Sequence, residues 1–85
     1  MGANRRRIER ILSLPPEAEF SDVRAIMMYF GWQERQGKGS HVVFRSPNET
    51  EHLVFPVHGR RVKRIYIQQM CRVLDLYNVD LDTID

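Results

Sequence analysis

The 85-residue sequence predicts a single α+β domain, in which three antiparallel strands are covered by helices on one face. Apolar residues recur with helical spacing near both ends of the chain, whereas residues 32–57 are rich in β-branched and aromatic residues and broken by turn signals. The hydrophobic fraction of 42% is ordinary for a globular protein and argues against disorder. Because the helices must bury their apolar stripes on one sheet face, the other face stays available to a partner.

Two helices are predicted before the strands. The apolar residues that set their period are Ile8, Ile11 and Leu12 in the first helix, and Val23, Ile26, Met27 and Phe30 in the second. The first helix spans residues 5–14 and ends at Pro15-Pro16, because the residue before a proline avoids the helical conformation. Ser21 is the expected cap of the second helix, and Gly31 stands where a helix commonly ends.

The three predicted strands follow one another directly. They comprise residues 32–35, 40–45 and 52–57. The turn at residues 36–39 contains two glycines, which permit positive φ, and the turn at residues 46–49 contains a proline. Such tight turns imply antiparallel pairing. Pro56 lacks a backbone donor, which places the third strand at an edge of the sheet or Pro56 at the strand end.

A helix and a tail complete the predicted order. The helix is indicated by the i, i+3, i+4, i+7 spacing of Ile67, Met70, Cys71 and Leu74. Residues 78–85 are expected to form a loose tail. Cys71 is the single cysteine, so it has no internal disulfide partner and is interpreted as a small core residue.

Several protein classes are disfavoured by composition. No run of about 18 apolar residues is present, and the basic segment at residues 5–10 has no apolar signal core behind it. We therefore expect a cytoplasmic protein without a membrane span. The three histidines are not spaced as a helical metal pair, and no metal or other cofactor is predicted.

Charge is distributed unevenly along the chain. The last eleven residues carry four aspartates and no Lys or Arg, whereas the first 74 residues carry 13 basic and 7 acidic side chains, a difference of +6. A basic body with an acidic tail indicates an anionic partner for the body, although ordinary solvation of a small domain gives the same totals.

His41 is the candidate catalytic residue. Strand alternation places Val42 and Phe44 on one face of the second strand, with His41, Val43 and Arg45 on the other. If the larger apolar pair faces the helices, His41 stands on the open face beside the turn that carries Lys38. A histidine there can transfer a proton near neutral pH, and cations can offset charge on a reacting phosphate. The alternative is an ordinary surface histidine.

A basic cluster precedes the last helix. It consists of Arg60, Arg61, Lys63 and Arg64. The helix dipole disfavours cations at a helix N-terminus, so four of them there indicate a site for an external anion such as phosphate. A solvated basic turn is the alternative interpretation.

The residues around His41 resemble a known family. The segment 37–45 is similar to the glycine, serine, histidine and phenylalanine positions of HicA-type toxins, as is Phe55-Pro56-Val57-His58-Gly59 with the basic stretch and short helix behind it. The preceding helix, ending in Phe30-Gly31-Trp32, also matches. The resemblance covers roughly residues 21–76, which divides the chain into an N-terminal helix and linker (1–20), a HicA-like domain (21–76) and an acidic tail (77–85).

The resemblance implies a fold and an activity. HicA-type toxins have a double-stranded-RNA-binding-domain-like fold, cleave messenger RNA and are neutralised by a HicB-type antitoxin. The functional histidine of the family falls on His41, and the flanking motif positions fall on Gly39 and Ser40. By analogy with the related RNA-binding fold, Arg61, Lys63 and Arg64 are implied to meet phosphates. Two features depart from the pattern: the helix at 5–14 lies outside it, and the last helix lacks the usual Gly-Thr at its start.

The leading hypothesis is therefore a metal-independent endoribonuclease toxin with His41 as general acid or base. The predicted RNA-binding residues are Lys38, Gly39, Ser40, Arg45, Arg60, Arg61, Lys63 and Arg64. Two alternatives stay open: a non-catalytic RNA-binding module of the same fold, and a protein-interaction domain that uses the open sheet face. The extra N-terminal helix either packs on the core or contacts a partner.

Overall fold

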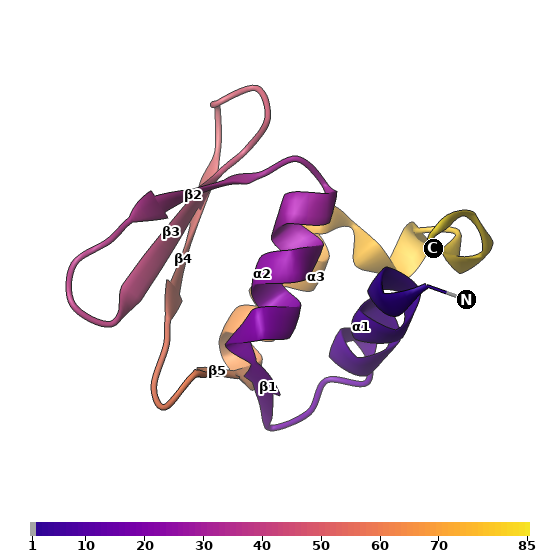
Figure 1. Ribbon diagram of the computed structural model, residues 1–85, viewed down its shortest axis with the longest axis horizontal. Helices are drawn as coiled ribbons and strands as arrows, with labels where there is room; N and C mark the ends of the chain where they lie inside the picture. The colour runs from indigo at the N-terminus through magenta and orange to yellow at the C-terminus, as the bar shows by residue number, and fades with distance from the viewer. Residues whose placement is uncertain (1) are drawn as a thin grey trace.

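A computed structural model describes residues 2–85. These residues fold into three helices and five short strands (Figure 1). The elements are α1 (Ala3–Leu12), β1 (Glu17–Glu19), α2 (Phe20–Tyr29), β2 (Gln33–Gln36), β3 (His41–Arg45), β4 (His52–Pro56), β5 (Arg61–Lys63), α3 (Arg64–Leu74) and two 3-10 turns, Leu76–Asn78 and Leu81–Thr83. The predicted α+β fold, with a three-stranded antiparallel sheet and an added N-terminal helix, is confirmed.

The main sheet has the order β2-β3-β4, with antiparallel pairing throughout. In its register His41 lies opposite Pro56 at one end of β3, and Arg45 lies opposite His52 at the other. β4 is an edge strand, as the proline required. In Figure 1 the helices α2 and α3 lie along one side of this sheet, while its other side carries no helix.

The core lies between the main sheet and the helices. Phe44, Leu53 and Phe55 supply its sheet side, and the ring of Phe44 meets that of Phe55 edge to face at 5.8 Å between centroids. The buried residues of α2 and α3 are Val23, Ile26, Met27, Ile67, Met70 and Cys71, six of the eight positions that the helical spacing predicted. The other two, Phe30 and Leu74, are half-buried and pack against this core. β3 and β4 therefore each present one apolar face inward and one face outward, whereas all four residues of β2 are exposed.

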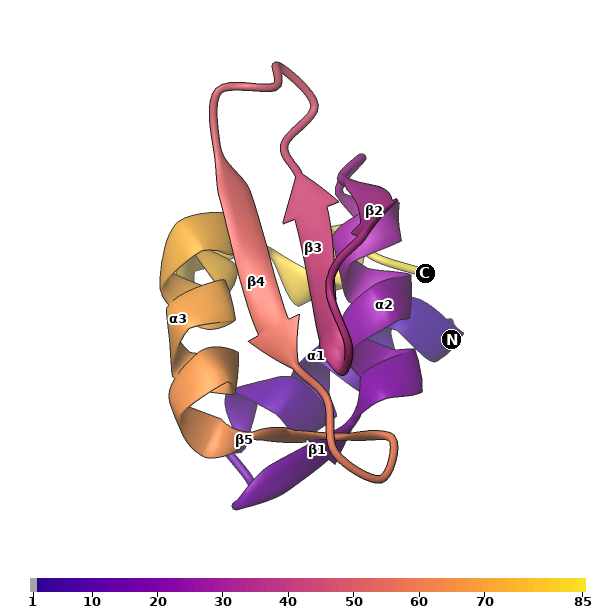
Figure 2. The ribbon, with the colours of Figure 1, turned by 90° about the vertical axis from the view of Figure 1, so that its left-hand side faces the viewer.

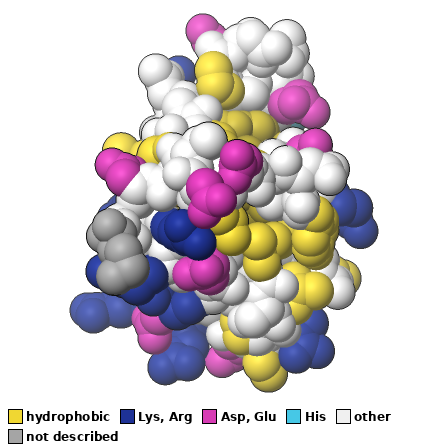
Figure 3. Space-filling model, turned by 90° about the vertical axis from the view of Figure 1, so that its right-hand side faces the viewer, with side chains coloured by type: hydrophobic (Ala, Val, Ile, Leu, Met, Phe, Trp, Pro, Cys, Tyr) yellow, Lys and Arg dark blue, Asp and Glu magenta, His cyan; other side chains and the backbone are white. Residues whose placement is uncertain are grey.

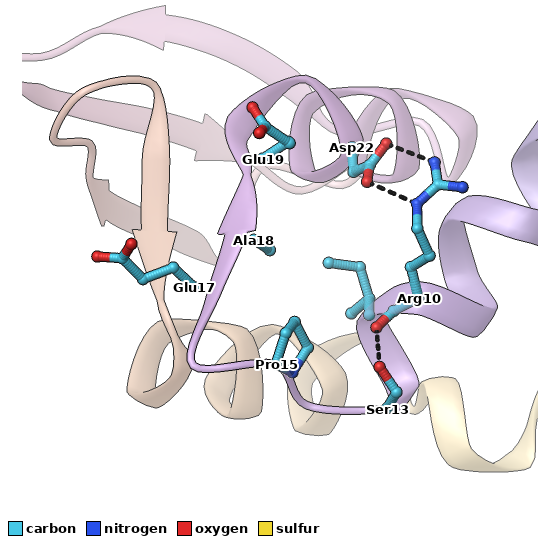
Figure 4. Close-up of a pocket in the computed structure, with 8 residues that line it drawn as sticks. Arg10, Ser13, Pro15, Glu17, Ala18, Glu19 and Asp22 are labelled. Atoms are coloured by element: carbon cyan, nitrogen blue, oxygen red, sulfur yellow. Dashed lines mark hydrogen bonds and ion pairs between the residues drawn. The ribbon is translucent and has the colours of Figure 1, made fainter.

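Helix α1 packs on the core from the side away from the main sheet (Figure 1). Ile8 and Ile11 are fully buried. Asp22 of α2 accepts two hydrogen bonds from the Arg10 guanidinium, at 2.9 and 3.0 Å, which ties the two helices together (Figure 4). Of the two roles predicted for this helix, the structure shows the packing role.

Two strands were not predicted. β1 and β5 form a separate two-stranded antiparallel sheet, in which Glu17 lies opposite Lys63 and Glu19 opposite Arg61 (Figure 2). The last helix therefore begins only at Arg64, directly after β5.

Two other sequence predictions were wrong. Ser21 is not a cap, because α2 already begins at Phe20, with Glu19 in an extended conformation before it. Residues 78–85 are not a loose tail. Ile84 is buried, Val79 and Leu81 pack against the core, and Asp82 forms an ion pair of 3.2 Å with Arg5 of α1. The end of the segment also lies against α1, where the backbone N–H of Arg5 donates to the carbonyl oxygen of Asp85 at 3.2 Å.

Candidate nucleic-acid site on the open sheet face

The outward face of the main sheet is basic and partly apolar. Alternation and register place on it Gln33 and Arg35 from β2, His41, Val43 and Arg45 from β3, and His52, Val54 and Pro56 from β4. None of these strand residues is acidic. The one acidic residue within these strands, Glu34, lies on the helix side, where it accepts hydrogen bonds of 2.8 and 2.9 Å from Arg24 of α2. An anionic chain would therefore meet no carboxylate from the three strands.

His41 begins β3 and is exposed on this face. Its backbone N–H donates to the carbonyl oxygen of Lys38 at 3.1 Å, and its Nδ1 lies 3.3 Å from the same oxygen. A carbonyl oxygen only accepts, so this second contact is a hydrogen bond when Nδ1 carries the proton. In the neutral ring Nε2 is then unprotonated and able to take a proton from a ligand.

Two glycines shape the loop before His41. A Cβ at Gly37 would collide with the backbone carbonyl of His41, so the close approach of the two loop ends requires glycine there. Gly39 has φ of +60°, a conformation that favours glycine, and open space surrounds the position where its Cβ would lie. The backbone beside His41 is consequently uncovered.

The loop lies against the segment that follows β4. The carbonyl of Ser40 accepts a hydrogen bond of 2.9 Å from the N–H of Val57. In Figure 2 the start of β3 and the end of β4 lie at the same end of the sheet, directly above the turn that leads to β5. His41 and residues 57–60 thus share one end of the molecule.

The turn from β4 to β5 is closed tightly. His58 and Arg61 exchange backbone hydrogen bonds of 3.0 and 2.9 Å, with Gly59 and Arg60 between them at φ of 57° and 64°. Positive φ at both central residues is typical of a type I′ hairpin turn. The carbonyl of Arg60 accepts a 2.8 Å hydrogen bond from the N–H of Phe20, which anchors the turn to α2. His58 and Arg60 are both exposed.

The other three basic residues of the cluster that precedes the last helix lie beside β1 or the loop before it. Arg61 forms an ion pair of 3.4 Å with Glu19, both side chains being about half exposed, and Lys63 lies opposite Glu17 in the register. The Nε of Arg64 donates to the carbonyl of Pro15 at 3.3 Å. The prediction of four cations awaiting an external anion therefore needs correction for Arg61, because β1 already supplies it with a carboxylate.

The structure separates the predicted site residues into those that lie at the same end of the sheet as His41 and those that lie further away. Lys38, Gly39, Ser40 and His41 form one loop, and Arg60 lies in the turn at the same end of the sheet. Arg45 lies four residues further along β3 than His41, or about 13 Å for an extended strand. Sequence reasoning missed Arg35, which lies opposite Val43 on the open face, because alternation was applied only to the second predicted strand.

The described residues give little support for a metal site, a membrane-spanning helix or a reactive cysteine. Among residues 2–85, no group of three or more His, Cys, Asp or Glu side chains is arranged to hold a metal ion. No helix in the described part of the chain is long and apolar enough to cross a membrane. Cys71 is fully buried, and this burial raises the pKa of its thiol above the ordinary value, as suits a core residue and not a nucleophile.

The fold and this face define a small α+β domain whose sheet carries an exposed histidine on the side away from its helices. A family model described as the HicA toxin of bacterial toxin-antitoxin matches residues 20–76. The chain therefore belongs to the HicA toxin family. The match begins at α2, so that α1 and β1 precede it. No match to a curated protein or to a solved structure is significant.

Proposed function

We propose that this protein is the toxin of a toxin–antitoxin module and an endoribonuclease that cleaves messenger RNA in the cytoplasm, with His41 as the proton-transfer group. The observation that carries the proposal is the pair of contacts from His41 to the carbonyl of Lys38 on an exposed face without carboxylates. An exposed imidazole with a fixed orientation and a free Nε2 is suited to general base catalysis.

The proposed reaction is attack of a ribose 2′-hydroxyl on the adjacent phosphate. His41 Nε2 removes the 2′-proton as the oxygen–phosphorus bond forms, and negative charge grows on the non-bridging phosphate oxygens. Lys38 and Arg60, at the same end of the sheet, offset that charge. Because a histidine and cations supply these functions, the proposed reaction requires no metal ion.

The other basic residues are proposed to hold the flanking nucleotides. Arg45 lies too far along β3 to reach the same phosphate as His41, and Arg61, Lys63 and Arg64 lie beyond the β4–β5 turn. Contacts at these positions follow the RNA backbone and raise affinity without reading sequence. The uncovered backbone at Gly39 and Ser40 allows RNA to approach His41 closely.

A HicB-type antitoxin is the proposed protein partner. It would neutralise the enzyme most directly by covering His41 and the turn that carries Arg60, because this blocks both the proton transfer and the phosphate contacts. A purified toxin–antitoxin complex should then lose cleavage activity. Full nuclease activity of the complex would contradict this part of the proposal.

The test is cleavage of a defined single-stranded RNA in EDTA by the wild type and by His41→Ala. We expect cleavage by the wild type alone, with both proteins folded according to circular dichroism. Equal cleavage by the two proteins would overturn the role of His41. If neither protein cleaves RNA but both retain it at low salt, the chain is a binding module of the same fold. Loss of binding as well would favour a protein-interaction domain.

A further inference from the structure

We propose that His58 is a second catalytic residue, the general acid that protonates the leaving 5′-oxygen of the RNA. This inference rests on the proposed ribonuclease function and extends it. Cleavage by the 2′-hydroxyl needs a base for one oxygen and a proton donor for another. The contact between Nδ1 of His41 and the Lys38 carbonyl favours the ring form that accepts a proton at Nε2, so His41 suits the base. The donor must then come from a neighbouring group.

The backbone places His58 near His41. His41 lies opposite Pro56 in the β3–β4 register, and the hydrogen bond from Val57 N–H to the Ser40 carbonyl extends that pairing by one residue. His58, two residues after Pro56, is therefore at the diagonal position relative to His41, and the backbones at diagonal positions in an antiparallel pair are about 7–8 Å apart. At that backbone separation two imidazole side chains can reach the same phosphodiester, each through a hydrogen bond of about 2.8 Å.

The turn holds His58 in place without covering it. The two backbone hydrogen bonds between His58 and Arg61 close the turn, and the bond from Phe20 N–H to the Arg60 carbonyl fixes its position against α2. Arg60 keeps a positive φ of 64°, which is unfavourable for a residue with a Cβ. A strained, closed turn that leaves its histidine exposed is the kind of local structure that active sites retain.

The complete step balances as follows. The 2′-O–H bond breaks and its proton goes to Nε2 of His41, while the 2′-oxygen bonds to phosphorus. The bond between phosphorus and the 5′-oxygen breaks, and His58 gives its proton to that oxygen. The products are a 2′,3′-cyclic phosphate and a 5′-hydroxyl end, and the proton on His41 returns to His58 through solvent.

The chain also contains a matched control. His52 is the third histidine and is also exposed, but it begins β4 and lies opposite Arg45, at the far end of the β3–β4 ladder. Removing it deletes the same kind of side chain without touching the end of the sheet where His41 lies. A general effect of losing a surface histidine would appear in both variants, whereas loss of the acid appears only in the variant at position 58.

The experiment compares two RNA substrates of the same sequence, one with the natural 5′-oxygen at a single cleavable linkage and one with sulfur at that bridging position. A thiolate leaves without protonation, so it makes a general acid unnecessary. We expect His58→Ala and His58→Gln to cleave the oxygen linkage about 100-fold more slowly than the wild type, and the sulfur linkage at nearly the wild-type rate. His41→Ala should be slow on both substrates, and His52→Ala should keep the wild-type ratio between the rates on the two substrates.

Three outcomes would decide against the proposal. Wild-type cleavage of the oxygen linkage by both position-58 variants would show that His58 transfers no proton. Equal slowing on the sulfur linkage, in variants whose thermal unfolding is unchanged, would assign His58 a binding or structural role instead. A wild type that cleaves neither substrate would overturn the proposed function itself, a result distinct from failure at position 58 alone.

Discussion

The carbonyl oxygen of Lys38 receives two contacts from His41, one from its backbone N–H at 3.1 Å and one from its ring Nδ1 at 3.3 Å. A single loop oxygen therefore orients both the start of β3 and the imidazole that we propose to be catalytic. The shape of the loop between the two residues determines where that oxygen lies. Substitutions in the loop should consequently change the position of the His41 imidazole and leave its chemical structure intact.

Gly37→Ala is expected to lower cleavage by displacing the His41 backbone. The added Cβ would collide with the His41 carbonyl, so one of the two must move, and misplacing a catalytic group by about 1 Å can cost about 100-fold in rate. The measurement is single-turnover cleavage at saturating RNA, together with the free energy of unfolding in urea.

Gly39→Ala is the matched control for this substitution. Its Cβ meets nothing within 4 Å, so only the positive φ is unfavourable, at a cost of about 1 kcal/mol in the free energy of unfolding. We expect it to be less stable than the wild type but faster than Gly37→Ala. If Gly39→Ala were the slower enzyme, the collision at Gly37 would not be what fixes the site.

A second prediction concerns β1, which precedes the region matched to the HicA toxin family. Glu19 forms an ion pair with Arg61, so it competes with any RNA phosphate for that guanidinium. Glu19→Gln should free Arg61 and steepen the dependence of RNA affinity on salt by about 0.7 in log–log slope, the value for one added contact to a single strand.

The control for this prediction is Glu49→Gln, which changes the net charge equally. Glu49 lies in the turn between β3 and β4, at the end of the sheet away from His41. Binding is measured for both variants across a salt series with a non-cleavable RNA. Equal slopes for the two would mean that only net charge matters and that Arg61 does not contact the RNA.

The side of the sheet on which His41 lies could be predicted from sequence, because it depends only on the alternation of residues within one strand. Phe44 is a large apolar residue three positions after His41, and once it enters the core, alternation places His41 on the outside. The same logic identified the buried positions of α2 and α3. These are local patterns, because the spacing of apolar residues within one helix or strand determines which side of that element faces the core.

The β1–β5 sheet could not be predicted in this way. Each strand has three residues and a single buried one, Ala18 in β1 and Val62 in β5, which is too short for alternation to show. Their pairing joins distant parts of the chain and depends on where α2 and α3 place them. The buried tail is similar, since Ile84 and Leu81 pack into a core formed by residues from distant parts of the chain.

On the side away from the main sheet, Figure 3 shows acidic and basic side chains interleaved, consistent with ion pairs such as Arg5 with Asp82.

Helix α1 should be necessary for the stability of the family domain, although it lies outside the family match. Ile11→Ala removes a fully buried side chain and leaves a cavity, which is expected to lower the free energy of unfolding by about 2–5 kcal/mol. Arg6→Ala, an exposed position on the same helix, should change it by less than about 0.5 kcal/mol. Urea unfolding followed by circular dichroism measures both. A similar small loss for the two variants would show that α1 contributes little to the core.

Cys71 provides a test of how tightly α3 packs in the core. Burial raises the pKa of its thiol, so at pH 8 the folded protein holds less of the reactive thiolate than the unfolded chain does. Alkylation by iodoacetamide should therefore be slow in buffer and fast in denaturant. Because the folded state keeps this proton more tightly, stability should also fall as the pH rises above the thiol pKa of the unfolded chain, and this fall should be absent in Cys71→Ala. Fast alkylation of the folded protein would mean that α3 separates readily from the rest of the core.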